Sequence, residues 1–248
     1  MQKTINDARI KNIFDFLISL KISSKKFTEK LNNQNLEMIN IVDEALTHTS
    51  ANKSFNHEKL EFFGDAVLRL SASEFIDKNF QSMSIGKRSE LRAQIVSDEW
   101  LTQLGKEIKI TNIIIIGSKA MGDKYSTDTI IAECVEALIG ALYKSLNSLN
   151  IINLWLDKYW EKDSKFILKE PYRFNAKSAL QEWCQEKAFN LPEYKIKETS
   201  KIHGDLRRFY CELFINGQLK ATSYGQSHKK AEKNAAIKVL EELFQTKE

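Results

Sequence analysis

Apolar residues recur at every third or fourth position through the first two-thirds of the chain, and no segment before residue 170 sustains an apolar–polar alternation. Such spacing lines up apolar side chains along one face of an α-helix. The sequence therefore predicts an all-α domain there, because these helices can bury their apolar faces only against one another. Within this domain, helices are predicted over residues 36–46, 60–80, 89–104, 129–146 and 151–168.

The pattern changes after residue 174, where a helix-like segment is followed by strands. Residues 209–215 alternate between apolar and other side chains, and Asn216-Gly217 is a favoured dipeptide for a tight hairpin turn. We predict a small α+β domain over residues 175–246, joined through a linker at 165–174 to the all-α domain at 1–164. Its predicted elements are a helix at 176–187, strands at 194–197, 209–215 and 219–225, and a helix at 227–244.

Three acidic residues fall on one face of the predicted helix 60–80 and the residues just before it. Glu58, Glu61 and Asp65 are spaced i, i+3 and i+7, which aligns their side chains on a helix. Like charges at this spacing repel each other, and they repel more strongly when they are removed from water. Taken alone, the stripe is more typical of a solvated acidic helix face than of a functional site.

A second pair of acids lies in an unusually apolar helix. Residues 130–142 contain almost no polar side chain except Glu133 and Glu136, so the helix is predicted to be buried nearly all round. Ionised carboxylates in such surroundings need a counter-charge or they take up protons. No Lys or Arg in this segment supplies that charge.

The two acid-bearing helices could instead share a divalent cation. With no His or Cys at metal-ligand spacing, the predicted ligand set is all oxygen, which favours Mg²⁺ or Mn²⁺ over zinc. Such an ion activates water and stabilises charge on a phosphoryl group, so the sequence favours metal-assisted phosphodiester hydrolysis.

The sequence disfavours disulfide-stabilised, zinc-stabilised and membrane-spanning proteins. Its three cysteines, Cys134, Cys184 and Cys211, are widely spaced, which argues against a disulfide scaffold or a structural zinc site. The longest aliphatic run, residues 113–116, is far shorter than a membrane span. We therefore expect a protein of the reducing cytoplasm with no membrane segment.

The segment from His57 to Leu68, His-Glu-Lys-Leu-Glu-Phe-Phe-Gly-Asp-Ala-Val-Leu, resembles the signature of the ribonuclease III family. The segment around Glu133 and Glu136 resembles the Asp-x-x-Glu-Ala motif of that family, and residues 45–50 and 90–97 add further matches. The last domain resembles a double-stranded-RNA-binding domain. The resemblance implies an all-α ribonuclease III endonuclease domain followed by an α-β-β-β-α RNA-binding domain.

The resemblance also implies an activity and the residues that perform it. Glu61, Asp65, Glu133 and Glu136 match the acids that hold catalytic Mg²⁺, for which Mn²⁺ can substitute, and Asp65 and Glu136 are those most tied to the chemistry. Glu58 matches an outer acid of the cluster, and Phe62 matches an aromatic plug at the interface of a homodimer. Expected substrates are precursors of ribosomal RNA and structured messenger and transfer RNA transcripts, cut to 5′-phosphate products without a small-molecule cofactor.

Proteins grip an A-form duplex through its phosphates and 2′-hydroxyls, because its bases are hidden in a deep, narrow groove. Polar side chains of one helix and a cationic helix N-terminus are suited to this task. The RNA-binding residues expected here are Ser178, Gln181, Glu182, Gln185, His228, Lys229, Lys230 and Lys233.

Three departures from the family pattern bear on these expectations. Glu133 stands where the family has Asp, and one extra methylene moves the carboxylate by roughly 1.5 Å. The loop at 202–208 lacks the proline of the family and displaces its histidine, and His228 replaces a lysine. Because a Mg²⁺ shell tolerates little error in distance, the alternative is a catalytically impaired protein that binds double-stranded RNA without cutting it.

Overall fold

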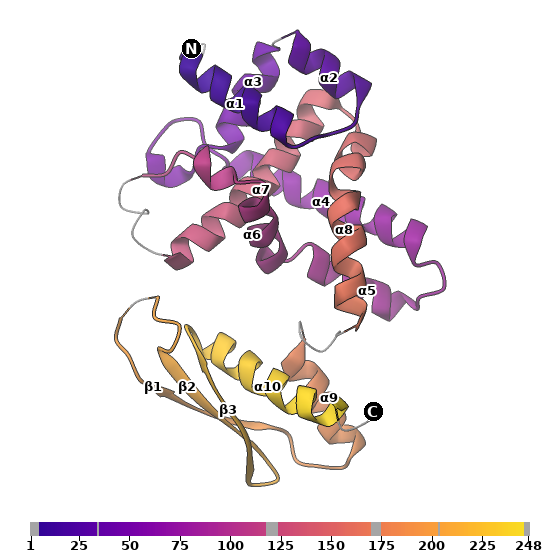
Figure 1. Ribbon diagram of the computed structural model, residues 1–248, viewed down its shortest axis with the longest axis vertical. Helices are drawn as coiled ribbons and strands as arrows, with labels where there is room; N and C mark the ends of the chain where they lie inside the picture. Colours follow the sequence, from indigo (N-terminus) through magenta and orange to yellow (C-terminus); the bar gives the residue numbers. More distant parts are fainter. Residues whose placement is uncertain (1–4, 34, 118–123, 170–174, 203, 246–248) are drawn as a thin grey trace. The chain divides into compact units, whose positions relative to one another are not determined.

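The computed structural model describes residues 5–33, 35–117, 124–169, 175–202 and 204–245. The chain divides into two compact units, Met1–Lys165 and Phe166–Glu248 (Figure 1). In the described part of the first unit the regular elements are helical, as predicted. They are α1 (Asp7–Ser19), α2 (Lys25–Asn32), α3 (Leu36–Ala45), α4 (Glu58–Asn79), α5 (Ile85–Ile95), α6 (Asp98–Glu107), α7 (Lys124–Leu146) and α8 (Leu149–Lys169), with short 3₁₀ turns at Thr49–Ala51 and Ile110–Asn112.

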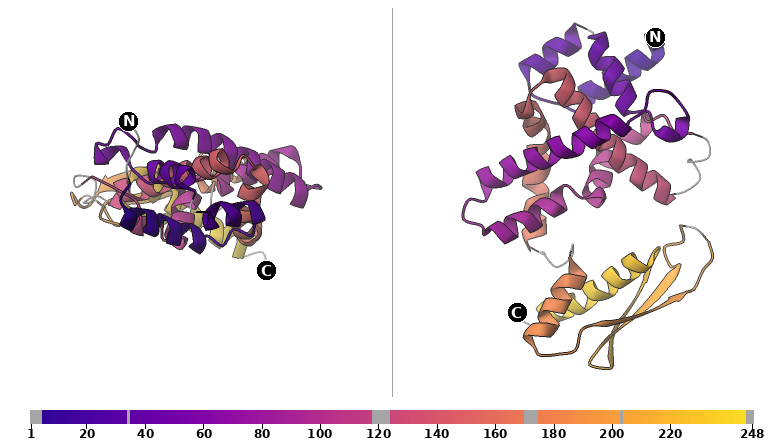
Figure 2. Two further views of the ribbon diagram at one scale, coloured as in Figure 1. Left: turned by 90° about the horizontal axis from the view of Figure 1, so that it is seen from above. Right: turned by 180° about the vertical axis from the view of Figure 1, so that it is seen from behind.

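Helices α4 and α7 cross in the middle of the first unit (Figure 1 and Figure 2). Gly64 of α4 lies directly against the backbone of α7, so a Cβ atom there would be 1.9 Å from the carbonyl oxygen of Glu136. Gly140 of α7 faces α4 in the same way, because its Cβ would be 2.3 Å from the carbonyl oxygen of Leu60. Only glycine allows two helix backbones to approach so closely, and this contact brings the two acid-bearing segments together.

Helix α7 is buried as its sequence predicted. Its apolar residues between Ile130 and Leu142 are at most 4% exposed, and it packs against α3, α4 and α6. The helix begins at Lys124 rather than at residue 129, and α8 continues through Lys169 into the segment predicted as a linker. The remaining linker residues, 170–174, lie outside the described residues.

The prediction of one helix over 89–104 is wrong. The structure has two helices there, α5 and α6, separated at Val96 and Ser97. Ser97 caps α6, because its hydroxyl oxygen accepts a hydrogen bond from the backbone N–H of Trp100 at 3.3 Å. Serine followed by two acidic residues is a strong signal for a helix N-terminus, and here it outweighs the continuous apolar spacing.

The second unit is a three-stranded antiparallel sheet with two helices on one face (Figure 1). The strand order is β1-β2-β3, and the Asn216-Gly217 turn between β2 and β3 has positive φ at both residues, as the dipeptide predicted. The α-β-β-β-α order is confirmed. The elements are α9 (Ala176–Glu186), β1 (Glu193–Glu198), β2 (Phe209–Ile215), β3 (Gln218–Gly225) and α10 (His228–Gln245).

The core of the second unit lies between the helices and the inner face of the sheet. Helix α9 contributes Leu180 and Cys184, strand β2 contributes Cys211 and Leu213, and α10 contributes a stripe of small and aliphatic residues. All three cysteines of the chain are buried free thiols. Within the described part of the chain, every helix is too short or too polar to span a lipid bilayer.

Candidate functional site

All five predicted acids line one cavity of about 610 Å³ beside the crossing of α4 and α7. Helix α4 supplies three of them from its first eight residues, and α7 supplies the other two. The prediction that these acids lie in one place is therefore met by the geometry. They are Glu58, Glu61, Asp65, Glu133 and Glu136.

Burial and mutual repulsion hold one carboxyl of the cluster in its protonated form. The pKa of Glu136 is raised to about 8, first by burial and then by the negative charges of Asp65 and Glu61. The pKa of Glu61 is also raised, again mainly by burial and then by Glu133. A divalent cation would relieve this repulsion and displace the proton. The donor set therefore fits a hard, oxygen-preferring ion.

Arg69 is a positive charge in this cluster that the sequence reasoning missed. It lies one turn after Asp65 on α4, and its Nε atom donates to both carboxylate oxygens of Asp65, at 2.7 and 2.9 Å. This hydrogen bonding raises the pKa of the guanidinium and fixes the orientation of the Asp65 carboxylate. The i, i+4 spacing of the two residues was the signal that could have found the pair.

Two histidines, His48 and His57, also line the cavity, although they are not at metal-ligand spacing in the sequence. The Nε2 atoms of His48 and His57 lie 3.3 and 3.2 Å from the same carboxylate oxygen, Oε2 of Glu133. Hydrogen bonding from His57 lowers the pKa of Glu133, so this carboxylate is ionised at neutral pH. Burial, and then the nearby His57, lower the pKa of His48, which is therefore mostly neutral at pH 7.

Non-local backbone contacts hold these two imidazoles in place. The N–H of His48 donates to the carbonyl oxygen of Ile115 at 2.9 Å, next to an isolated bridge between Thr47 and Ile115. The N–H of His57 donates to the carbonyl oxygen of Thr47, also at 2.9 Å. The loop from residue 47 to residue 57 therefore closes on itself, and both rings face Glu133.

Phe62 lies at the rim of the cavity with 84% of its surface exposed. A phenyl ring rarely stays in water without a reason, and large exposed apolar side chains often mark contact surfaces. This observation suits the interface role that the sequence resemblance implies for Phe62.

The residues expected to bind RNA lie on two helices of the second unit. Ser178, Gln181, Glu182 and Gln185 are all exposed on α9, opposite its buried face. The first two turns of α10 carry His228, Lys229, Lys230 and Lys233, and Ser227 caps this helix by accepting from the N–H of Lys230 at 3.2 Å. The histidine of the 202–208 loop, residue 203, lies outside the described residues.

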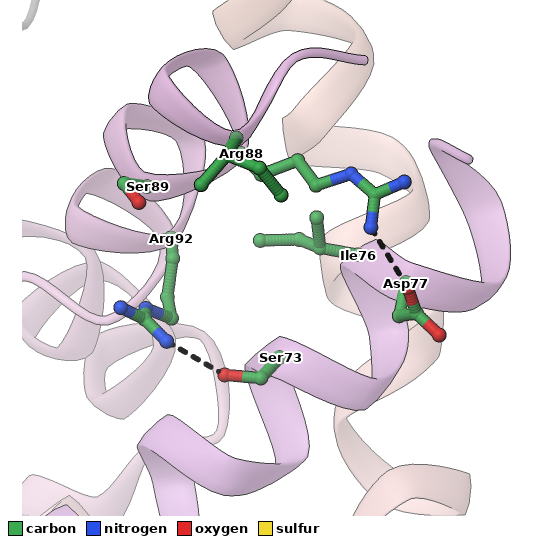
Figure 3. A pocket seen from close by; sticks show the side chains of 7 residues that line it. Ser73, Ile76, Asp77, Arg88, Ser89 and Arg92 are labelled. Carbon is green, nitrogen blue, oxygen red and sulfur yellow. Dashed lines mark hydrogen bonds and ion pairs between the residues drawn. The ribbon is translucent and has the colours of Figure 1, made fainter. Parts of the chain in front are cut away.

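A separate hollow of about 360 Å³ lies between α4 and α5 (Figure 3). Its two arginines already have partners: Arg88 donates to Asp77 at 2.8 Å, and Arg92 donates to Ser73 at 3.0 Å. The acids of the first cavity do not line it. We assign no chemistry to this hollow.

Comparison with known proteins adds to this geometry. Residues 38–150 match the family described as Ribonuclease-III-like, and residues 176–243 match the double-stranded RNA binding motif. A protein named Ribonuclease 3 from Prochlorococcus marinus is 47% identical over 96% of each chain. One named Ribonuclease 3 2 from Nostoc is 36% identical over 79% of this chain and 81% of its own. The solved nuclease domain of ribonuclease III from Campylobacter jejuni is 25% identical, covers 64% of this chain and 97% of its own, and has a TM-score of 0.49.

Proposed function

This chain belongs to the ribonuclease III family, and from that premise we propose that it is a Mg²⁺-dependent endonuclease that hydrolyses phosphodiester bonds of double-stranded RNA. The observation that carries this proposal is the convergence of five carboxylates on one cavity, in a chain that also carries a double-stranded RNA binding motif. The proposed substrates are precursors of ribosomal RNA and structured messenger and transfer RNA transcripts.

The cation would be held by Glu61, Asp65, Glu133 and Glu136, and Mn²⁺ could take the place of Mg²⁺. When bound, it supplies activation of water and stabilisation of charge on the phosphoryl group, giving 5′-phosphate and 3′-hydroxyl ends. The chain's own residues prepare this site. Arg69 orients Asp65, and the two imidazoles hold Glu133. Burial keeps Glu136 protonated without metal, and this carboxyl would lose its proton when the cation binds.

Glu58 is the outermost acid of the cluster in this proposal, and it contributes to the choice of the cut site in RNA. It lies at the first position of α4 and lines the same cavity as the metal-binding acids.

The second unit would hold the duplex by its shape. The polar face of α9 suits 2′-hydroxyls, and the lysines at the start of α10 suit phosphates, with the helix dipole adding to their attraction. Binding should therefore weaken steeply as salt concentration rises and depend little on sequence.

The direct test is cleavage of a long RNA duplex by the purified full chain. We expect cleavage with Mg²⁺ or Mn²⁺, none with EDTA, and binding in both conditions as measured by a gel shift. Binding without cleavage at any concentration of either cation would favour the alternative, an RNA-binding protein impaired by Glu133. The absence of binding as well as cleavage would contradict both proposals.

We further propose that the active form is a homodimer that uses Phe62 at its interface. Replacing this exposed ring, Phe62→Ser, should shift the protein from dimer to monomer in sedimentation velocity, because the change removes apolar contact area only in the assembly. Phe166→Ser is the matched control, since Phe166 is 51% exposed on α8. An unchanged dimer in Phe62→Ser, or dissociation of both variants, would count against the interface.

A further inference from the structure

Two imidazoles and one carboxylate of the cavity are arranged as the ligands of a metal ion other than Mg²⁺. Ligand atoms of His48, His57 and Glu133 all lie within 4.8 Å of one another. The imidazole nitrogens are 3.3 and 3.2 Å from the same oxygen of Glu133. A tetrahedral ion with bonds of about 2.0–2.1 Å needs ligand atoms about 3.3–3.4 Å apart. Two of the three edges therefore already have the length that a bound zinc ion requires.

We propose that His48, His57 and Glu133 form a binding site for a borderline transition cation such as Zn²⁺. The third edge, between the two imidazoles, is at most 4.8 Å, so closing it needs an inward movement of no more than about 1.5 Å. The fourth position faces the cavity and is open to water or to Glu61, whose carboxylate is 3.3 Å from His57. Imidazole nitrogen favours Zn²⁺, Co²⁺ or Ni²⁺ over Mg²⁺, which prefers oxygen.

The surroundings of the two rings support this use. The Nδ1 atom of His48 accepts a hydrogen bond from the backbone N–H of Ser50 at 3.1 Å and lies 2.7 Å from the hydroxyl of the same residue, which keeps Nε2 directed towards Glu133. The ring of His57 is 2% exposed, and its Nδ1 atom is buried without a hydrogen bond to any residue that the structure describes. The burial of this ring limits its movement and keeps its Nε2 atom 3.2 Å from Oε2 of Glu133.

Occupation of this site would oppose catalysis, an effect that rests on the proposed function. Glu133 is shared between the three-ligand site and the carboxylates proposed to hold Mg²⁺. A Zn²⁺ ion held by both imidazoles would engage the Glu133 oxygen that they already contact. Zn²⁺ would therefore act as an inhibitor that competes for one ligand of the magnesium site.

The test uses the full chain, stripped with EDTA, desalted and titrated with Co²⁺ alone. We expect one equivalent to bind with the intense visible bands of tetrahedral Co²⁺, and Zn²⁺ to displace it. No sulfur-to-cobalt band should appear, because all three cysteines are buried away from solvent. His48→Gln should weaken binding by at least about tenfold, while His228→Gln, which changes an exposed histidine of α10, should leave it unchanged.

Absence of the tetrahedral bands, or equal bands in the wild type and a folded His48→Gln, would overturn the site. If His48→Gln does not fold, as judged by its melting curve, Glu133→Gln replaces it with the same expected loss. The titration contains neither RNA nor Mg²⁺, so it tests the metal site separately from the proposed nuclease activity. An inactive nuclease could still bind Co²⁺, and an active nuclease could fail to bind it.

The competition is tested in a cleavage assay with Mg²⁺. A fixed free Zn²⁺ concentration should reduce the wild-type rate by about tenfold more than the His48→Gln rate, each relative to its zinc-free value. Equal inhibition of the two proteins would contradict the proposed competition.

Discussion

The Glu136→Gln variant should cut double-stranded RNA at least about a thousandfold more slowly than the wild type, while its affinity for the duplex stays the same. Burial raises the pKa of Glu136 to about 8, and glutamine keeps the shape of this side chain but cannot carry the charge that a divalent cation needs. The measurements are single-turnover cleavage with Mg²⁺ and a gel shift in EDTA. Loss of RNA affinity in parallel with cleavage would contradict the proposed role, because the residues proposed to bind the duplex are on α9 and α10.

The same variant has a second expected effect, on stability in the absence of metal. The pKa of Glu136 is raised in the folded protein to about 8, so its neutral form stabilises the fold fully below the unfolded pKa, and this contribution is lost as pH rises towards 8. Glutamine mimics the neutral form at every pH. Thermal unfolding in EDTA should therefore show little difference between variant and wild type near pH 5 and a more stable variant at pH 8, by about 1–2 kcal/mol after allowance for partial exposure to solvent. A constant difference across this range would show that the carboxyl does not keep its proton.

The Gly64→Ala variant should lose both stability and activity. Its new Cβ would lie 1.9 Å from the carbonyl oxygen of Glu136, which is far inside van der Waals contact, so α4 and α7 must move apart at their crossing. We expect a loss of about 2–4 kcal/mol in the free energy of unfolding, measured by denaturant titration. Because the two helices carry opposite halves of the acid cluster, cleavage by the folded fraction should also fall, by about a hundredfold.

Gly86→Ala is the matched control for that change. Gly86 also lies in a helix, α5, but a Cβ atom there meets nothing within 4 Å. Its stability should stay the same or rise by up to about 1 kcal/mol, because alanine is the better helix former. Equal stability of Gly64→Ala and the wild type would show that the crossing of α4 and α7 can accept a Cβ atom at position 64. The close backbone contact would then not be essential.

The carboxylate cluster could be predicted because its signal is local in sequence. Glu61 and Asp65 are one turn apart on a helix, Glu133 and Glu136 are likewise one turn apart, and an acid in an apolar helix needs a partner. Two such helices can share one divalent cation only where they meet. The point where the two helices meet is also visible in the sequence, because each helix has a glycine where the backbones touch.

The histidines could not be predicted in the same way. His48 reaches Glu133 because its loop is anchored to Ile115, a residue far along the chain, and no pattern near position 48 encodes that contact. His57 was visible in the sequence directly before the acidic motif, but its orientation depends on the same loop. The break between α5 and α6 is different, because Ser97 is recognisable in the sequence as a helix cap and outweighs the continuous apolar spacing around it.

The contacts of two imidazoles with one oxygen of Glu133 couple positions 48, 57 and 133 energetically. Aspartate at 133 would draw its carboxylate back by roughly 1.5 Å, leaving both rings without their common acceptor. Without those two rings, the longer side chain of Glu133 would lose the contacts that fix its carboxylate. The effects of substitutions at these three positions should therefore be strongly non-additive.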